Sequence, residues 1–266
     1  MKKTTVNDIV RMKQEARKIP VLTAYSFQVA RILDSSGIPL ILVGDSAGMV
    51  EAGYENTIPV TVDEMIYHTR SVVRGRRSAL VVSDMPFASY QVSLVEARKN
   101  AARLVKEAGA EAVKLEGGRR ISRAISSIVR MGIPVMGHIG LTPQSVHATG
   151  GYKVQGRTKA DAMTILDDAK ALEEAGVFSM VLECVPAALA KEITGSVSIP
   201  TIGIGAGPDC DGQVLVVNDM LGLSGPDGVA RYVKKYAELE SIISGAVREY
   251  AREVSEGAYP SKGHSY

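Results

Sequence analysis

Four acidic residues and one histidine stand at or just after the ends of apolar segments, each on a different segment. They are Asp45, Asp84, Glu116, His138 and Glu183. Carboxylate and imidazole groups can hold a metal ion or move protons, provided that folding brings them together. The carboxyl ends of parallel strands share one face of a closed barrel, so we predict that the five side chains converge there.

The oxygen-rich set favours a hard divalent cation at this predicted site. Asp45 and Asp84, with Glu116 as a third candidate, supply carboxylates that suit Mg²⁺, whereas zinc prefers more histidine or thiolate. A cation would also compensate the negative charge, because an unpaired ionised carboxylate is costly inside a protein. Each aspartate taken alone is more often a helix N-cap than a ligand, so the prediction depends on the whole set.

Lys114 lies two residues before Glu116, so both side chains point to the same side of their strand. The same rule predicts a shared side for Val43 and Asp45, Val82 and Asp84, Met136 and His138, and Val181 and Glu183. Two interpretations of Lys114 stay open, namely substrate binding and an ion pair that only satisfies Glu116. His138 is interpreted first as a hydrogen-bonded wall residue and second as a base. The Cys184 side chain is expected to point to the opposite side of its strand from Glu183, which favours a small core thiol over a nucleophile.

Eight short apolar segments rich in Val, Ile and Leu predict the strands that position these residues. They cover residues 20–25, 40–45, 79–84, 112–117, 134–140, 179–185, 200–206 and 212–219. Helical segments lie between them, most clearly 93–108, where apolar residues recur at three- and four-residue intervals. This alternation predicts an α/β fold, a (β/α)₈ TIM barrel. A doubly wound sheet is the alternative, but no G-x-G-x-x-G follows the first strand.

Three segments lie outside this alternation. Residues 5–18 predict an extra N-terminal helix ahead of the first strand, and residues 226–256 predict one or two helices that close the barrel. The polar stretch 148–158 is bounded by glycines and is interpreted as a mobile loop that closes over substrate, or as an ordinary surface loop.

Composition predicts one globular domain over residues 1–266. The chain is 45% apolar and 23% charged, and no linker-like segment divides it. Its net charge of +2 and scattered basic residues argue against a nucleic-acid partner. No segment resembles a membrane span or a signal-peptide core, and two cysteines are too few for a secreted disulfide scaffold. We therefore expect a cytoplasmic protein with no membrane partner.

Six motifs, in order along the chain, resemble ketopantoate hydroxymethyltransferases. They are LVGDSAGMV (42–50), SDMPF (83–87), AVKLEGG (112–118), GHIGLTPQS (137–145), GGYKVQGR (150–157) and IGIGAG (202–207). The similarity extends from about Thr4 to the final YPSKGHSY, so it covers nearly the whole chain. It implies a (β/α)₈ barrel of the phosphoenolpyruvate/pyruvate type.

The resemblance also implies an activity. This is transfer of a hydroxymethyl group from 5,10-methylenetetrahydrofolate to 3-methyl-2-oxobutanoate, which gives 2-dehydropantoate in the first committed step of pantothenate biosynthesis. It further implies a bound Mg²⁺ and a large cytoplasmic homo-oligomer, typically a decamer. Carried over by motif, the resemblance implies that Asp45 and Asp84 bind the metal and the substrate, and that Glu116 binds the metal directly or through water. It implies that Ser46 and Lys114 bind the oxo acid. Glu183 would be the base, with His138 as a candidate supporting residue.

The chemistry of these residues agrees with that activity. A 2-oxo acid can chelate Mg²⁺ through its keto and carboxylate oxygens, which stabilises the charge that forms when C3 loses its proton. Other functions stay open, however. They are another Mg²⁺-dependent 2-oxo-acid lyase or mutase on the same barrel, a Schiff-base aldolase that uses Lys114, and a non-catalytic ligand-binding barrel. The K-K-C-G-H pattern of isocitrate lyases is absent from the sequence.

Overall fold

Eight parallel strands close into a barrel, in which each strand pairs with the next along the chain and β8 pairs back to β1. The computed structural model describes residues 2–225 and 230–266. The strands are β1 (Ile19–Thr23), β2 (Leu40–Val43), β3 (Leu80–Asp84), β4 (Ala112–Glu116), β5 (Val135–Gly140), β6 (Ser179–Glu183), β7 (Thr201–Ile204) and β8 (Gly212–Leu215). The predicted barrel is therefore confirmed.

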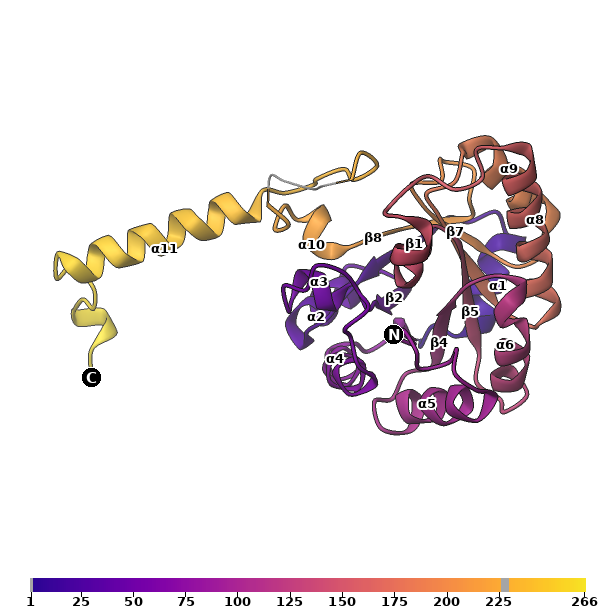
Figure 1. Cartoon of the computed structure of the whole chain (residues 1–266). Helices are drawn as coiled ribbons and strands as arrows, with labels where there is room; N and C mark the ends of the chain where they lie inside the picture. The colour runs from indigo at the N-terminus through magenta and orange to yellow at the C-terminus, as the bar shows by residue number, and fades with distance from the viewer. Residues whose placement is uncertain (1, 226–229) are drawn as a thin grey trace. The chain divides into compact units, whose positions relative to one another are not determined.

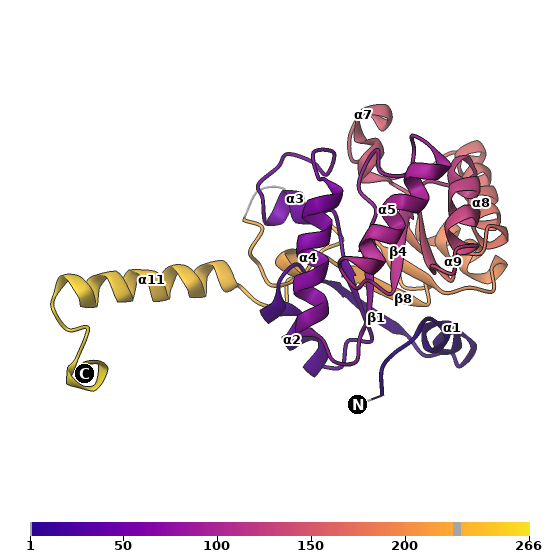
Figure 2. The same cartoon turned by 90° about the horizontal axis from the view of Figure 1, so that it is seen from below.

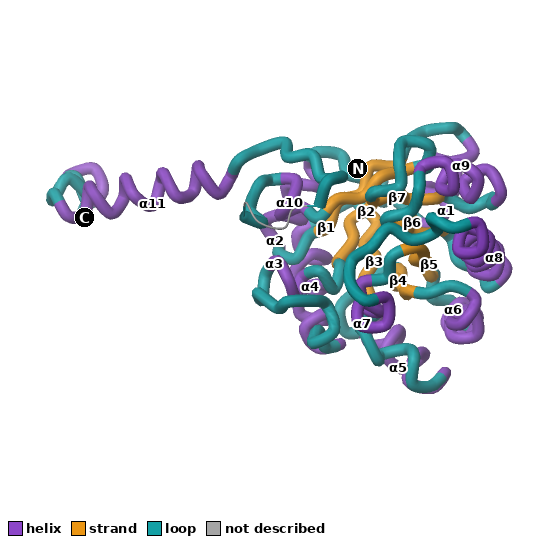
Figure 3. Tube along the Cα trace, turned by 45° about the horizontal axis from the view of Figure 1, so that its top comes forward, coloured by secondary structure: helices purple, strands orange, loops and turns teal. Residues whose placement is uncertain are grey.

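Helices surround these strands, as the purple and orange segments of Figure 3 show. The helices that follow strands β1 to β6 are α2 (Phe27–Ser35), α3 (Ala47–Val50), α4 (Val62–Gly75), α5 (Leu94–Lys106), α6 (Ser122–Val129), α7 (Val146–Thr149), α8 (Lys159–Glu174) and α9 (Ala187–Ser196). Short 3₁₀ turns occupy Arg119–Ile121 and Pro143–Ser145. Residues 205–211 join β7 to β8 and contain no helix.

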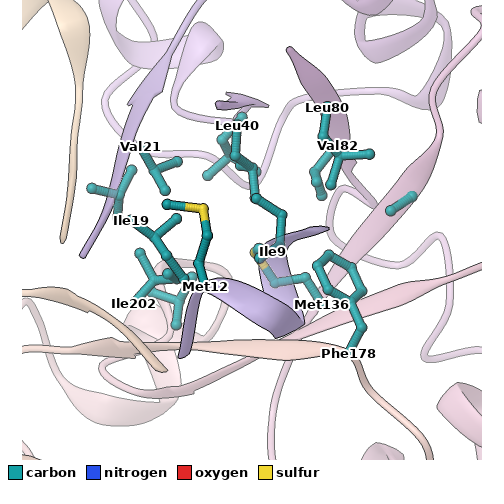
Figure 4. Close-up of a cluster of buried hydrophobic side chains, with 14 of the residues drawn as sticks. Ile9, Met12, Ile19, Val21, Leu40, Leu80, Val82, Met136, Phe178 and Ile202 are labelled. Carbon is teal, nitrogen blue, oxygen red and sulfur yellow. The ribbon is translucent and has the colours of Figure 1, made fainter. Parts of the chain in front are cut away.

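The extra N-terminal helix is confirmed as α1 (Val6–Gln14), which is shorter than the predicted 5–18. It begins after Thr5, whose hydroxyl accepts the Asp8 N–H while the Asp8 carboxylate accepts the Thr5 N–H, a capping box. Its Ile9 and Met12 pack among strand residues such as Val21, Leu40 and Met136, as Figure 4 shows. In Figure 2, α1 and α7 lie at opposite ends of the barrel. Helix α1 therefore closes the end opposite the loop that follows β5.

Side-chain alternation along the strands matches the prediction on β3, β5 and β6. Val82, Met136 and Val181 belong to the apolar cluster inside the barrel, so residues two positions later face the same interior. On β2, however, the interior residues are Leu40 and Leu42. The sequence paired Val43 with Asp45 on one inner face, and this pairing is wrong. Asp45 lies in a turn after β2 has ended, where strand alternation no longer applies.

The predicted strand 212–219 is also too long. β8 ends at Leu215, and α10 (Val217–Met220) follows at once. An apolar run of this length cannot by itself distinguish a strand from a helical turn. Of the predicted 226–256 helical region, residues 226–229 lie outside the described residues, and the structure forms a helix only in α11 (Leu239–Ser255).

Two compact units can be separated along the chain, and β8 lies at the end of the first. The first is Met1–Val216, which contains the barrel of Figure 1, and the second is Val217–Tyr266, which contains α10, α11 and the short turn Lys262–His264. Within the second unit, the Tyr236 N–H donates to the Met220 carbonyl. The single domain expected over 1–266 stays a prediction. Among the described residues, no helix combines the length and apolar character needed to cross a membrane.

Candidate active site

Parallel pairing brings the predicted polar residues together at the carboxyl end of the barrel. Asp84 and Glu116 are the last residues of β3 and β4, and Glu183 is the last residue of β6. The register places Asp84 beside Lys114 on β4, and Glu116 beside His138 on β5. The predicted convergence of these strand ends is present in the structure.

Lys114 is the positive centre of this cluster. Its Nζ lies 3.2 Å from Asp84 Oδ2 and 3.8 Å from Glu116 Oε1. The same ammonium lies 3.2 Å from His138 Nδ1. Burial opposes the charged form of Lys114, but the surrounding carboxylates outweigh it and raise the pKa of the ammonium above its usual range. Lys114 is therefore held as a cation, and the ion pair with Glu116 that the sequence left open is present.

Asp45 and Asp84 form a pair of buried carboxylates with incomplete compensation. The Asp45 N–H donates to Asp84 Oδ2 across 3.1 Å, whereas Asp84 Oδ1 is buried without a hydrogen-bond partner among the described residues. Burial raises the pKa of Asp45 well above its usual range, and the charges of Asp84 and Glu116 raise it further. The single positive charge of Lys114 therefore faces three acidic groups, so a second cation could balance the remaining negative charge.

Glu116 is held on both carboxylate oxygens. Its Oε2 accepts the Gln144 N–H at 3.0 Å, and its Oε1 lies 3.5 Å from His138 Nδ1 and close to Lys114. Burial raises the pKa of Glu116 to about 7, although the Lys114 charge lowers it. Within the described ranges, no three His, Cys, Asp or Glu side chains form a ready-made metal site. A cation here would take few protein ligands and complete its coordination with substrate or water, as Mg²⁺ does.

His138 and Glu183 form the second part of the site. His138 Nε2 lies 3.2 Å from Glu183 Oε2, but the contact lacks hydrogen-bond alignment, and Nε2 has no other bond within the described residues. Burial lowers the pKa of His138 well below its usual range, and the Lys114 charge lowers it further. Because a lysine ammonium has only donors, Nδ1 accepts from it, and the ring hydrogen belongs on Nε2. The neutral imidazole thus carries its hydrogen on the nitrogen that lies nearer to Glu183.

Glu183 differs from the other carboxylates in its surroundings. Burial raises its pKa to about 7, and only the Lys114 charge opposes this rise. A carboxylate with such a pKa can exchange protons near neutral pH. The neighbouring Cys184 has its pKa raised to about 11, mainly by burial and then by the Glu183 charge, so its thiol stays protonated at neutral pH.

Three uncharged residues that the sequence did not single out complete the site. The Tyr25 hydroxyl lies 2.8 Å from Ser46 Oγ, so it holds in place the hydroxyl of Ser46, the residue predicted to bind the oxo acid. Gln144 donates from Nε2 to Asp45 Oδ2 at 2.8 Å, and Tyr90 bonds the Gln144 side chain at 2.7 Å. The motif containing LTPQS was the available signal for Gln144, but no spacing rule marked either tyrosine.

The predicted closing loop lies at the mouth of the barrel. Tyr152 places its hydroxyl 3.9 Å from Met49 Sδ, and the Gln155 N–H donates to the Cys184 carbonyl at 2.8 Å. Partial burial raises the pKa of Tyr152, and nearby charges, first Glu183 and then Asp45, raise it further. The loop therefore reaches α3 through Tyr152 and brings its phenol near enough to Glu183 and Asp45 for their charges to affect it. Its mobility stays a prediction.

Comparison with known proteins identifies the family. A family model described as ketopantoate hydroxymethyltransferase matches residues 3–262. The chain belongs to the ketopantoate hydroxymethyltransferase family. Among its relatives, the 3-methyl-2-oxobutanoate hydroxymethyltransferase of Geobacter metallireducens is 57% identical over 265 residues, which cover 100% of this chain and 99% of that protein. The protein of the same name from Geotalea daltonii is 56% identical with the same coverage.

Several solved structures have the same fold as this member of the ketopantoate hydroxymethyltransferase family, although their sequences are only distantly similar to it. A phosphonopyruvate hydrolase crystallised with oxalate and Mg²⁺ aligns with a TM-score of 0.64 and 14% identity, covering 99% of this chain and 93% of that chain. A 2,3-dimethylmalate lyase of the PEP mutase/isocitrate lyase superfamily aligns with a TM-score of 0.60 and 14% identity, covering 97% and 89%. These likenesses confirm the (β/α)₈ barrel fold.

Proposed function

We propose that this chain transfers a hydroxymethyl group from 5,10-methylenetetrahydrofolate to 3-methyl-2-oxobutanoate and so forms 2-dehydropantoate, the first committed step of pantothenate biosynthesis. Full-length relatives that carry the name 3-methyl-2-oxobutanoate hydroxymethyltransferase support this activity. The observation that carries the proposal is the position of Lys114, which lies between the Asp84 carboxylate and the His138 imidazole that contacts Glu183. Cation-binding groups thus lie on one side of Lys114, and the candidate base lies on the other, beyond His138.

The donor set suits Mg²⁺. Asp45 and Asp84 would hold the ion, because both carboxylates are buried and Asp84 Oδ1 has no partner among the described residues. Glu116 would contact it through water, since a backbone N–H and Lys114 already engage its two oxygens. When bound, Mg²⁺ supplies a Lewis acid that stabilises negative charge on the keto oxygen of the substrate.

Glu183 is the proposed base that takes the proton from C3 of 3-methyl-2-oxobutanoate. Its pKa of about 7 makes it basic enough to accept the proton and still largely ionised in mildly alkaline solution. His138 stays neutral and places Nε2 3.2 Å from Glu183 Oε2, so it packs beside the carboxylate without supplying a competing charge. This assigns His138 a supporting role rather than the role of the base.

Ser46 and Lys114 are proposed to hold the oxo acid. Ser46 is supported by the Tyr25 hydroxyl, and the Lys114 ammonium adds positive charge beside the developing oxyanion. The carbanion at C3 forms a bond to the folate-borne methylene carbon, and overall both C–N bonds of that carbon break. One water supplies the hydroxyl group, and its second proton and the C3 proton end on the two folate nitrogens. Tyr152 covers the mouth during this reaction and limits access of bulk water.

A Schiff-base mechanism through Lys114 is less well supported. An imine needs a neutral amine nucleophile, whereas the neighbouring carboxylates raise the pKa of Lys114 and keep it protonated. Borohydride added with 3-methyl-2-oxobutanoate should therefore leave Lys114 unlabelled, as judged by mass spectrometry. Labelled Lys114 together with activity that survives a chelator would establish the aldolase mechanism instead.

Exchange of the C3 proton with solvent tests the proposed function directly. The protein is incubated with 3-methyl-2-oxobutanoate in D₂O, without folate, and loss of the C3 proton signal is followed by NMR. We expect exchange that needs Mg²⁺ and stops when a chelator is added. Exchange at the same rate with and without Mg²⁺ would contradict the metal site, and absence of exchange and of product would favour a lyase of other specificity or a binding protein.

The wider assignments rest on composition and charge for location and partners, and on the family resemblance for the oligomer. We propose a cytoplasmic homo-oligomer, a decamer, that has small-molecule substrates and neither nucleic-acid nor membrane partners. Analytical ultracentrifugation should give a mass of about ten times the 28.3 kDa of the chain. A monomer or dimer at micromolar concentration would contradict the decamer.

A further inference from the structure

Gln144 makes hydrogen bonds to two of the carboxylates of the candidate site. Its side-chain Nε2 donates to Asp45 Oδ2 at 2.8 Å, and its backbone N–H donates to Glu116 Oε2 at 3.0 Å. The residue follows β5 in the short turn Pro143–Ser145 and is 3% exposed. It lies 99 residues from Asp45 and 28 from Glu116 along the chain. A single buried residue thus ties the turn after β2 to the end of β4.

The orientation of the Gln144 amide is fixed by its partners. Nε2 also donates to the Met85 carbonyl at 2.9 Å, so its two partners, that carbonyl and the Asp45 carboxylate in its ionised form, are both acceptors. Oε1 accepts from the Tyr90 hydroxyl at 2.7 Å and from Gln91 Nε2 at 3.2 Å. A flipped amide would place its oxygen against two acceptors, so only one orientation is compatible with the network.

Tyr90 links this amide back to Glu116. Its hydroxyl accepts the Glu116 N–H at 3.0 Å and donates to Gln144 Oε1, while the Gln144 N–H donates to the Glu116 carboxylate. These three hydrogen bonds form a closed ring that contains Glu116, Tyr90 and Gln144. Since all three residues are buried, loss of one member removes a hydrogen-bond partner from each of the others, with no bulk water to replace it.

We propose that Gln144 is the positioning residue that sets Asp45 for metal binding, a role that rests on the proposed function. By occupying Asp45 Oδ2, Gln144 fixes the plane of the carboxylate and leaves the other oxygen free of bonds within the described part of the chain. By anchoring Glu116 with its backbone, it holds the third carboxylate at a fixed place beside Lys114. Partners of this kind orient metal ligands without touching the ion.

The test is metal binding by the intact protein, measured apart from turnover. Mn²⁺ replaces Mg²⁺ as the probe, and the dissociation constant is obtained by electron paramagnetic resonance with 3-methyl-2-oxobutanoate present. Gln144→Met keeps the size of the side chain and removes its polar atoms, and we expect the dissociation constant to rise about 10- to 100-fold. Gln14→Met makes the same chemical change at an exposed position of α1 and should bind as the unchanged protein does.

Tyr90→Phe provides a second variant should Gln144→Met fail to fold, as judged by circular dichroism. It removes one bond to Oε1 and keeps the bonds from Nε2, so we expect a smaller loss of affinity in the same direction. Activity of either variant should partly recover when Mg²⁺ is raised, because the defect lies in binding the ion. Unchanged Mn²⁺ affinity in both folded variants overturns the role of Gln144 and leaves the proposed function standing. Absence of Mn²⁺ binding by the unchanged protein overturns both.

Discussion

The backbone N–H of Asp45 donates to Asp84 Oδ2 across 3.1 Å, whereas the second oxygen of Asp84 is buried without a hydrogen bond among the described residues. The bond ties the Asp84 carboxylate to the backbone of Asp45, 39 residues away, and the Asp84 charge raises the pKa of the Asp45 carboxyl. Two like charges so close together favour a cation between them or a proton on one of them. The burial of Asp45 raises its pKa and so makes the second outcome easier when no cation is bound.

Asp84→Asn should weaken the metal site without unfolding the protein. The amide keeps the size of the side chain but removes one negative charge, so we expect Mg²⁺ affinity to fall about 10- to 100-fold, measured by isothermal titration calorimetry. Asp63→Asn, at an exposed position of α4 outside the site, is the matched control. Equal Mg²⁺ affinity in the two variants would remove Asp84 from the metal site.

Glu183→Gln should abolish proton exchange at C3 of 3-methyl-2-oxobutanoate. The amide cannot accept the proton, and loss of a general base typically slows such a step about 10²- to 10⁴-fold. Binding of the oxo acid should stay within a few-fold of normal, because Ser46 and Lys114 hold it. NMR exchange rates and calorimetric affinities measure the two effects separately. Exchange at the normal rate would exclude Glu183 as the base.

The exchange rate should rise with pH through about 7 and then level off. The raised pKa of Glu183 means that its proton-accepting form accumulates only above this value, so the direction of the change is fixed. Glu116 titrates in the same range, so the profile belongs to a coupled set unless a variant separates them. Glu116→Gln should retain the inflection near pH 7. A rate that falls as pH rises through 7 would contradict the assignment.

Tyr152→Ala should impair the reaction more than Tyr152→Phe. We propose that the ring covers the mouth, whereas its hydroxyl makes only a long contact with Met49 Sδ at 3.9 Å. We expect the alanine variant to lose about tenfold or more in kcat/KM as water enters the site, and the phenylalanine variant to stay near normal. Steady-state kinetics of both variants check this. A larger loss in the phenylalanine variant would assign the function to the hydroxyl instead.

Asp34 is a structural carboxylate outside the site and provides a stability prediction. Burial alone would raise its pKa, but the N–H groups of Ala79, Ser78 and Arg77 donate to it and lower the pKa below its ordinary 3.8. Its stabilising contribution is therefore complete above about pH 4 and is lost as pH falls through the lowered value. Asp34→Ala should reduce the free energy of unfolding by about 2–4 kcal/mol at pH 7, measured by urea denaturation. Equal stability at pH 7 would contradict this.

Much of the fold could be predicted because its signals are local. The predicted segments that became β3, β4 and β6 end at or within two residues of Asp84, Glu116 and Glu183, so approximate strand limits and candidate site residues followed from the same pattern. Alternation placed Lys114 and Glu116 on one side of β4, where their contact is observed. The end of β8 was not predictable in this way, because the apolar run beyond Leu215 also suits a helical turn.

The sequence by itself determined which strand ends carry polar groups and that these ends meet on one face of a barrel. Tertiary structure alone decided which atoms pair. The amide of Gln144 meets Asp45 from 99 positions away, the Tyr25 hydroxyl meets Ser46, and Lys114 contacts Asp84 on the neighbouring strand. The reason is physical. Side-chain alternation depends on neighbours in sequence, whereas a hydrogen bond near 3 Å depends on how distant turns pack once the barrel has closed.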